Sequence, residues 1–152
     1  MATAIRVATI ADVPAMAALL GELFAIEADF AIAPEVQARG LGLLLERADA
    51  VVLVAVAEGA VAGMCTVQLS ISTARGGLSA GIEDVVVTAR CRGRGIGGTL
   101  IAAAESWAQG KGALRIALLA DETNAPALDF YDHLGFTRTR LVWLAKPLDE
   151  AG

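Results

Sequence analysis

A glycine-rich loop between a β-branched strand and an amphipathic helix constrains this chain more than any other feature. The loop, Arg92-Gly93-Arg94-Gly95-Ile96-Gly97-Gly98, follows the predicted strand Ile82–Val87. The first N–H groups of a helix have no partner within the helix, and the helix dipole adds partial positive charge to them. Glycines let a ligand approach that backbone closely, and the flanking arginines add charge. The junction therefore predicts a site for an anion such as a pyrophosphate.

Two other anion-binding motifs compete for the same loop. Gly93-x-Gly95-x-x-Gly98 matches the G-x-G-x-x-G fingerprint of dinucleotide-binding proteins. That fingerprint belongs to a first strand and needs a second βαβ half, for which the roughly 55 residues after Gly98 are too few. A nucleotide-hydrolase P-loop requires Gly-Lys followed by Ser or Thr, and the sequence contains neither combination.

The order of predicted elements is β, α, α, β, β, β, α, β, α, β. Pro14 and Pro34 mark the first turns of two helices, and Glu58-Gly59-Ala60 separates two β-branched runs as a hairpin does. The order predicts an α/β (α+β) sandwich whose mixed central sheet is mostly antiparallel in its N-terminal half, continues in a βαβ unit and carries helices on both faces. We expect a single domain over residues 1–152. The predicted strands are 5–7, 51–57, 61–72, 82–87, 114–119 and 136–145, and the predicted helices are 12–27, 34–45, 96–110 and 125–134.

Composition excludes several classes of protein. The net charge of −5 argues against a nucleic-acid surface. No run of about 20 apolar residues lacks charges or polar interruptions, so we expect no membrane span. We expect a cytoplasmic protein, because the N-terminus shows no secretory pattern and Cys65 and Cys91 fit reduced thiols. With His133 as the only histidine, no metal site is expected.

Two separated motifs resemble the GNAT (Gcn5-related N-acetyltransferase) superfamily. Val85-Val86-Val87 followed by Arg92-x-x-Gly95-x-Gly97 is similar to its [Q/R]-x-x-G-x-[G/A] signature. Asn124-x-x-Ala127-x-x-Phe130-Tyr131-x-x-Leu134-Gly135-Phe136 is similar to a later motif of the superfamily. The order of elements agrees too, so the resemblance covers the whole chain. It implies a single GNAT domain that uses acetyl-coenzyme A (acetyl-CoA) as cosubstrate and needs no metal.

The resemblance also implies which residues bind the cofactor. The pyrophosphate would lie on the backbone amides of Gly93, Gly95, Ile96, Gly97 and Gly98, with Arg92 and Arg94 nearby. The pantetheine arm would add to the central strand at Val85, Val86 and Val87. Asn124 would contact the same arm. The alternative for the valines is an ordinary buried strand, and both interpretations hold together if the main chain does the binding.

Catalytic candidates follow from the chemistry that the resemblance implies, which is direct attack of a neutral amine on a thioester. Such an amine is mostly protonated at neutral pH, so a general base helps. We predict Glu83 as that base, with Asp84 as its neighbour, on opposite faces of the strand. Tyr131 occupies the position of the phenol that protonates the departing thiolate. A loop-organising carboxylate at Glu83 and a space-filling Tyr131 are the structural alternatives.

The acceptor is less constrained than the cofactor. The segment 82–87 resembles the Glu-Asp strand of glucosamine-phosphate N-acetyltransferases, whereas Leu119 stands where ribosomal-protein N-terminal acetyltransferases carry a glutamate. We expect a small-molecule primary amine, with acceptor contacts from the segment Phe24–Leu45. The alternatives are a protein N-terminal or lysine acetyltransferase and a non-catalytic acyl-CoA-binding module. A homodimer through strand edges is compatible with the sequence, which does not require one.

Overall fold

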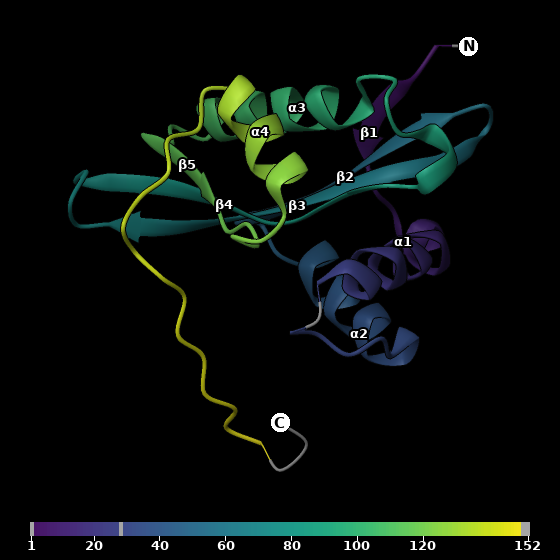
Figure 1. Cartoon of the computed structure of the whole chain (residues 1–152), viewed down its shortest axis with the longest axis horizontal. Coiled ribbons are helices and arrows are strands. Elements are labelled where there is room, and N and C mark those ends of the chain that lie inside the picture. Colours follow the sequence, from purple (N-terminus) through teal and green to yellow (C-terminus); the bar gives the residue numbers. More distant parts are fainter. Residues whose placement is uncertain (1, 28, 150–152) are drawn as a thin grey trace. The chain divides into compact units, whose positions relative to one another are not determined.

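The strands of the chain form one mixed sheet in the order β1-β2-β3-β4-β5 (Figure 1). The first four strands are antiparallel neighbours, and β5 runs parallel to β4. This confirms the predicted mixed sheet with its βαβ unit. The structure is a computed structural model that describes residues 2–27 and 29–149. The strands are β1 (Ala4–Val7), β2 (Ala50–Ala57), β3 (Ala60–Ser72), β4 (Gly77–Val87) and β5 (Arg115–Leu118).

Helices cover both faces of the sheet, as predicted. Helices α1 and α2 lie on one face and α3 lies on the other (Figure 1). The chain divides into two compact units, residues 1–118 and 119–152, and α4 belongs to the second. No helix in the described ranges has the length and apolarity that a bilayer span requires. The helices are α1 (Val13–Ile26), α2 (Pro34–Leu45), α3 (Ile96–Gly110) and α4 (Ala125–His133), with short 3-10 turns at Ile10–Asp12 and Ala89–Cys91.

Local signals account for the elements that frame the sheet. Proline in the first turn begins both α1 and α2, where its missing N–H removes no intrahelical bond. Glu58 and Gly59 close the β2–β3 hairpin, and both have positive φ (55° and 77°). A two-residue turn of that hand matches the twist of antiparallel strands. The predicted hairpin therefore forms at the predicted residues.

The main core lies between the sheet and the helices α1 and α2. On the other face, Gly63 allows α3 to approach the sheet closely. A Cβ atom at Gly63 would lie 3.2 Å from Leu100 Cδ1 and 3.1 Å from the Val86 carbonyl oxygen, closer than side chains normally pack. The core side chains on the α1–α2 face include Met16, Leu19, Leu20, Leu41, Val52, Val54, Met64 and Val86.

The last predicted strand, 136–145, does not form. The described residues after α4 adopt neither helix nor strand, and Leu141 and Leu144 are 89% and 87% exposed. The prediction was wrong because it rested on side-chain pattern and β propensity alone. A strand also requires a neighbour that exchanges backbone hydrogen bonds with it, and no described strand pairs with this segment.

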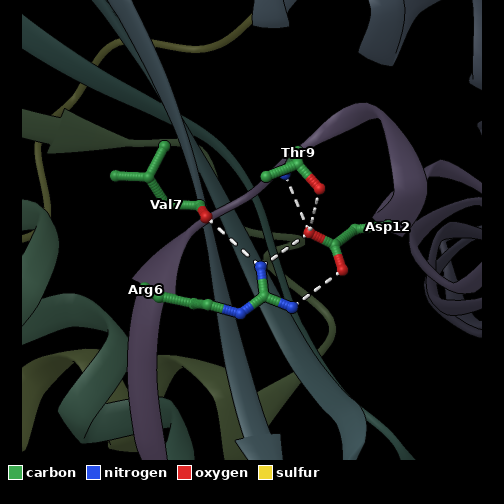
Figure 2. A network of polar contacts seen from close by, with 4 residues as sticks. All are labelled: Arg6, Val7, Thr9 and Asp12. Atoms are coloured by element: carbon green, nitrogen blue, oxygen red, sulfur yellow. Dashed lines mark hydrogen bonds and ion pairs between the residues drawn. The ribbon is translucent and has the colours of Figure 1, made fainter.

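A polar network joins β1 to the start of α1 (Figure 2). Both terminal nitrogens of Arg6 donate to the carboxylate of Asp12, at 2.7 and 2.9 Å. The backbone N–H of Thr9 donates to the same carboxylate at 2.8 Å. The Arg6 hydrogen bonds and then the Thr9 amide lower the pKa of the buried Asp12 from 3.8 to about 2. The ionised carboxylate thus fixes the turn that directs the chain from β1 into α1.

Asp12→Asn should lower the free energy of unfolding at pH 7 by about 1–3 kcal/mol, the usual contribution of hydrogen bonds to a charged group. Because folding lowers the pKa of Asp12, its stabilisation is complete above about pH 4 and is lost as the pH falls towards 2. Urea titrations should therefore show the wild type and the variant converging in acid. Asp49→Asn is the control, since its exposed pair with Arg47 should contribute little. An equal effect of both substitutions would contradict this role for Asp12.

Candidate active site

The glycine loop turns sharply into α3. Gly93 and Gly95 have φ of 77° and 80°, a backbone region that L side chains rarely adopt. Gly95 caps the helix, and Thr99 N–H donates to its carbonyl at 3.1 Å. The amides of residues 96–98 precede that bond and have no partner within the helix. Cβ atoms at Gly93, Gly95 and Gly98 would meet nothing within 4 Å, so a ligand has room to approach the loop.

Two carboxylates from distant parts of the chain hold the arginines of this loop. Arg92 Nε donates to the Val87 carbonyl at 2.9 Å, and its Nη2 lies 4.0 Å from Glu22 Oε1. Arg94 Nη1 lies 3.1 Å from Glu58 Oε1 in the β2–β3 turn. Both pairs are substantially exposed, so an incoming anion can replace either carboxylate at small cost.

Among the described strands, β5 pairs with only part of the β4 edge that faces away from β3. Its pairing with β5 spans Ser79–Ile82 and ends there, although β4 continues to Val87. Thr88 N–H donates to the Ala62 carbonyl on β3 at 2.8 Å. The antiparallel alternation therefore turns the backbone N–H and C=O of Val85 and Val87 away from β3. This part of β4 can receive an extended ligand as an added strand would bind.

A β-bulge separates the two acidic residues of β4. Thr66 on β3 pairs with Asp84, and Val67 pairs with Ile82, so Glu83 is an extra residue without a partner opposite it. The regular alternation predicted for Glu83 and Asp84 is interrupted at this bulge. Glu83 is exposed, whereas Asp84 is partly buried and faces a cleft.

This cleft, which we call the acceptor cleft after the role proposed for it below, has a volume of about 640 Å³ and is lined by residues from α1, α2, the turn after α2, β3 and β4. Large apolar side chains of the two helices make up much of its wall. Asp84 and Gln68 provide polar groups from the sheet. The segment from Phe24 to Leu45, predicted to contact the acceptor, contributes about half of the lining. The lining residues are Leu20, Phe24, Gln37, Gly40, Leu41, Leu43, Leu44, Glu46, Arg47, Gln68 and Asp84.

Asp84 has the environment of a proton acceptor. Its Oδ2 accepts a hydrogen bond from Thr66 Oγ1 at 2.7 Å, and its own N–H donates back to that oxygen at 3.1 Å. Its Oδ1 has no hydrogen-bond partner among the described residues. Burial raises the pKa of Asp84 above its usual 3.8, the Thr66 bond opposes that rise, and the negative charge of Glu83 adds to it. A carboxylate with a raised pKa is a better base than a fully solvated one.

The residues predicted on the later motif lie together on α4, in the second unit. Asn124 Oδ1 accepts the Ala127 N–H at 3.2 Å and so caps the helix. The Tyr131 ring packs edge-on against Phe130 and Phe136, with centroid distances of 5.1 and 5.8 Å. The motif thus has structural roles in this unit, as helix cap and aromatic cluster.

A family comparison decides what kind of protein carries these features. Residues 43–136 match the model described as the Acetyltransferase (GNAT) family, and the match includes the glycine loop, β4 and α4. The chain belongs to this family. It is therefore an acetyl-CoA-dependent N-acetyltransferase, as the two motifs predicted.

Solved structures support the same fold for this GNAT enzyme. A transcriptional regulator from Bacillus halodurans C-125 superposes with a TM-score of 0.86 at 26% identity, over 95% of this chain and 99% of that one. An aminoglycoside acetyltransferase from an uncultured soil metagenomic sample gives 0.78 at 25% identity, over 97% of both chains. Glucosamine-6-phosphate N-acetyltransferase from Arabidopsis thaliana gives 0.77 at 24% identity, over 98% of this chain and 100% of that one. A search of curated protein sequences finds no significant match.

Sequence reasoning missed the carboxylate that holds the entry to the GNAT glycine loop. Glu22 on α1 accepts the Thr88 hydroxyl at 2.8 Å and the Ala89 N–H at 3.0 Å. These contacts join residues 66 and 67 positions apart. No local sequence pattern predicts the contact of Glu22 with Thr88 and Ala89, because a glutamate on the polar face of an amphipathic helix is common and usually faces solvent.

Proposed function

We propose that this GNAT enzyme transfers the acetyl group of acetyl-CoA to the primary amine of a small molecule. One observation carries the proposal. Asp84 lines the acceptor cleft and lies on the same stretch of β4 that β5 leaves unpaired. An acceptor amine in the cleft and an acyl donor along the strand would therefore meet at this stretch.

The residues around the loop fit acetyl-CoA. The amides of residues 96–98 and the space in front of Gly93 and Gly95 suit its pyrophosphate. The backbone N–H and C=O of Val85 and the N–H of Val87 face the pantetheine arm in this arrangement, whereas the Val87 carbonyl already accepts from Arg92 and the Val86 side chain lies in the core. When bound, acetyl-CoA supplies a thioester carbonyl, and a β4 N–H would polarise that carbonyl as an oxyanion-hole donor does.

The proposed chemistry is direct transfer. The neutral amine nitrogen forms a bond to the carbonyl carbon and passes its proton to Asp84, directly or through water. The bond from that carbon to sulfur breaks, and the CoA thiolate leaves and takes a proton from Tyr131. The sequence predicted Glu83 for this role, but the burial of Asp84 and its place in the cleft favour Asp84. Burial and the Asp84 charge raise the pKa of the neighbouring Cys65 thiol to about 12. Cys65 thus stays protonated, which favours direct attack over an acyl-cysteine intermediate.

Tyr131→Phe tests the proposed proton donor to the leaving thiolate. The substitution keeps the ring and its edge contacts with Phe130 and Phe136 but removes the hydroxyl. We expect kcat to fall by about 10²-fold or more, with the Kd of CoA changing less than threefold. Stopped-flow thiol release and calorimetry measure the two quantities. An unchanged kcat would eliminate Tyr131 as the donor.

The function itself is tested by CoA calorimetry followed by thiol release from acetyl-CoA across a panel of amines and peptides. Saturable CoA binding with release that depends on a small amine supports the proposal. Preference for peptides with a free N-terminus or lysine would assign a protein acetyltransferase instead. CoA binding without any amine-dependent release would assign a binding module.

Cys65 and Cys91 are buried free thiols, which is in keeping with a reducing, cytoplasmic setting for the reaction.

A further inference from the structure

One side of the acceptor cleft is built from large apolar side chains, and polar or charged residues make up the rest of its lining. Leu20 and Phe24 come from one face of α1, four residues apart, and Leu41, Leu43 and Leu44 come from α2. Phe24 also packs against Phe30, with a centroid distance of 5.3 Å, which fixes one side of the wall. An acceptor that fills this space gives up its hydration shell to apolar side chains. A hydrocarbon skeleton placed on this side is therefore stabilised by burial.

The cleft lining carries three charged side chains, and one of them, Arg47, is already paired with a carboxylate outside the lining. Asp84 and Glu46 are its carboxylates, and Arg47 is its cation. Arg47 is held by two hydrogen bonds to Asp49, at 2.7 and 2.8 Å. A polycationic acceptor would bring several ammonium groups into a space with two carboxylates and an opposing guanidinium. A phosphorylated acceptor would find only a cation that is already paired.

The available carboxylate oxygen lies at the polar side of this wall. Asp84 Oδ2 is engaged by Thr66, and Oδ1 has no partner in the described chain. One ammonium group can therefore hydrogen-bond Oδ1 while the carbon skeleton attached to it lies against the leucines. This arrangement suits a molecule with a single charged end.

We propose, building on the acetyltransferase function above, that the acceptor is a compact primary monoamine with an apolar body, an arylalkyl or branched alkyl amine, whose ammonium group contacts Asp84 and whose hydrocarbon packs against Phe24 and the α2 leucines. The proposal separates this chain from two similar structures. One is named for aminoglycosides and the other for a sugar phosphate, and both classes of acceptor are rich in polar or charged groups.

Steady-state thiol release with 2-phenylethylamine, isoamylamine, ethanolamine, sisomicin and glucosamine 6-phosphate tests the proposal. Burial of a phenyl group predicts a kcat/KM for 2-phenylethylamine roughly 10- to 150-fold above that for ethanolamine. Sisomicin and glucosamine 6-phosphate should fall below both apolar amines. A preference for either polar acceptor would overturn the inference while leaving the acetyltransferase function intact.

Leu43→Gln places a polar group on the wall at a residue that is 62% exposed, so the variant should fold normally. We expect it to reduce the preference for 2-phenylethylamine over ethanolamine by about three- to tenfold. Ile71→Gln is the matched control, because Ile71 is 73% exposed and lies on β3 outside the cleft lining. Equal preferences in both variants and the wild type would overturn the proposed hydrocarbon contact.

Binding provides a readout that does not depend on turnover. Calorimetry of 2-phenylethylamine with the CoA-saturated protein should give saturable binding that Leu43→Gln weakens and Ile71→Gln does not. Such binding without acetylation of any amine would refute the proposed function but support this acceptor class. No binding of 2-phenylethylamine, or tighter binding of sisomicin, would refute the acceptor class.

Discussion

Asp84→Asn should lower kcat for amine acetylation by about 10²–10⁴-fold, the usual contribution of a general base. The substitution keeps an oxygen that can accept the Thr66 hydrogen bond, so the fold of β4 should persist. Without the base, the reaction depends on the small fraction of amine that is already neutral. The deficit of the variant should therefore shrink as the pH rises towards the pKa of the acceptor amine. Thiol-release rates from pH 6 to 10 measure this trend.

Glu83→Gln is the matched control for that experiment. Glu83 is exposed and sits at the bulge, adjacent to Asp84 in the chain, so the two substitutions remove equal charge from the same strand. We expect Glu83→Gln to change kcat less than about threefold, because a side chain outside the cleft wall contributes no proton transfer. If Glu83→Gln instead causes the large loss and Asp84→Asn does not, Glu83 is the base, as its position in the sequence suggested.

Gly95→Val should raise the Kd for CoA on the order of 100-fold, equivalent to losing about two charge-assisted hydrogen bonds. A branched side chain opposes the φ of 80° at this position and would occupy the space through which a phosphate reaches the helix amides. Calorimetry with CoA measures the change. Normal affinity in the variant would show that the pyrophosphate binds elsewhere.

Strain alone can also weaken a protein, so this prediction needs a control with equal strain. Gly76→Val provides it, because Gly76 has φ of 73°, is surrounded by open space and lies in the β3–β4 turn. Both variants should lose thermal stability to a similar extent, since a left-handed residue costs a side chain about 1–2 kcal/mol. Only Gly95→Val should lose CoA affinity. Equal losses of affinity would mean that general destabilisation explains the effect.

Features specified by neighbouring residues were predictable from the sequence. Pro14 and Pro34 fix helix starts through a local property of the proline ring. Glu58 and Gly59 specify a hairpin because few residues tolerate positive φ. The sharp turn of the glycine loop was predictable for the same reason, because Gly93 and Gly95 adopt a positive φ that few other residues tolerate. The anion site at this loop stays a prediction.

Features that depend on distant partners were not predictable in this way. The side-chain pattern of 136–145 indicates a strand, yet no described strand pairs with it. Alternation placed Glu83 and Asp84 on opposite faces, but the pairing with β3 puts an extra residue at Glu83. The hydrogen bond between Glu22 and Thr88 requires that α1 and the end of β4 lie side by side in the folded chain. Each of these features depends on contacts between residues that are distant in the sequence.

Helix α1 faces both substrates of the proposed reaction. Leu20 and Phe24 line the acceptor cleft. Glu22 lies about 200° around the helix from Leu20 and accepts a hydrogen bond from Thr88, just before the glycine loop. If amine binding shifts α1, the hydrogen bonds of Glu22 to Thr88 and Ala89 connect that shift to the start of the glycine loop. In that case thermodynamic reciprocity requires that acetyl-CoA changes the affinity for the amine by the same factor by which the amine changes the affinity for acetyl-CoA.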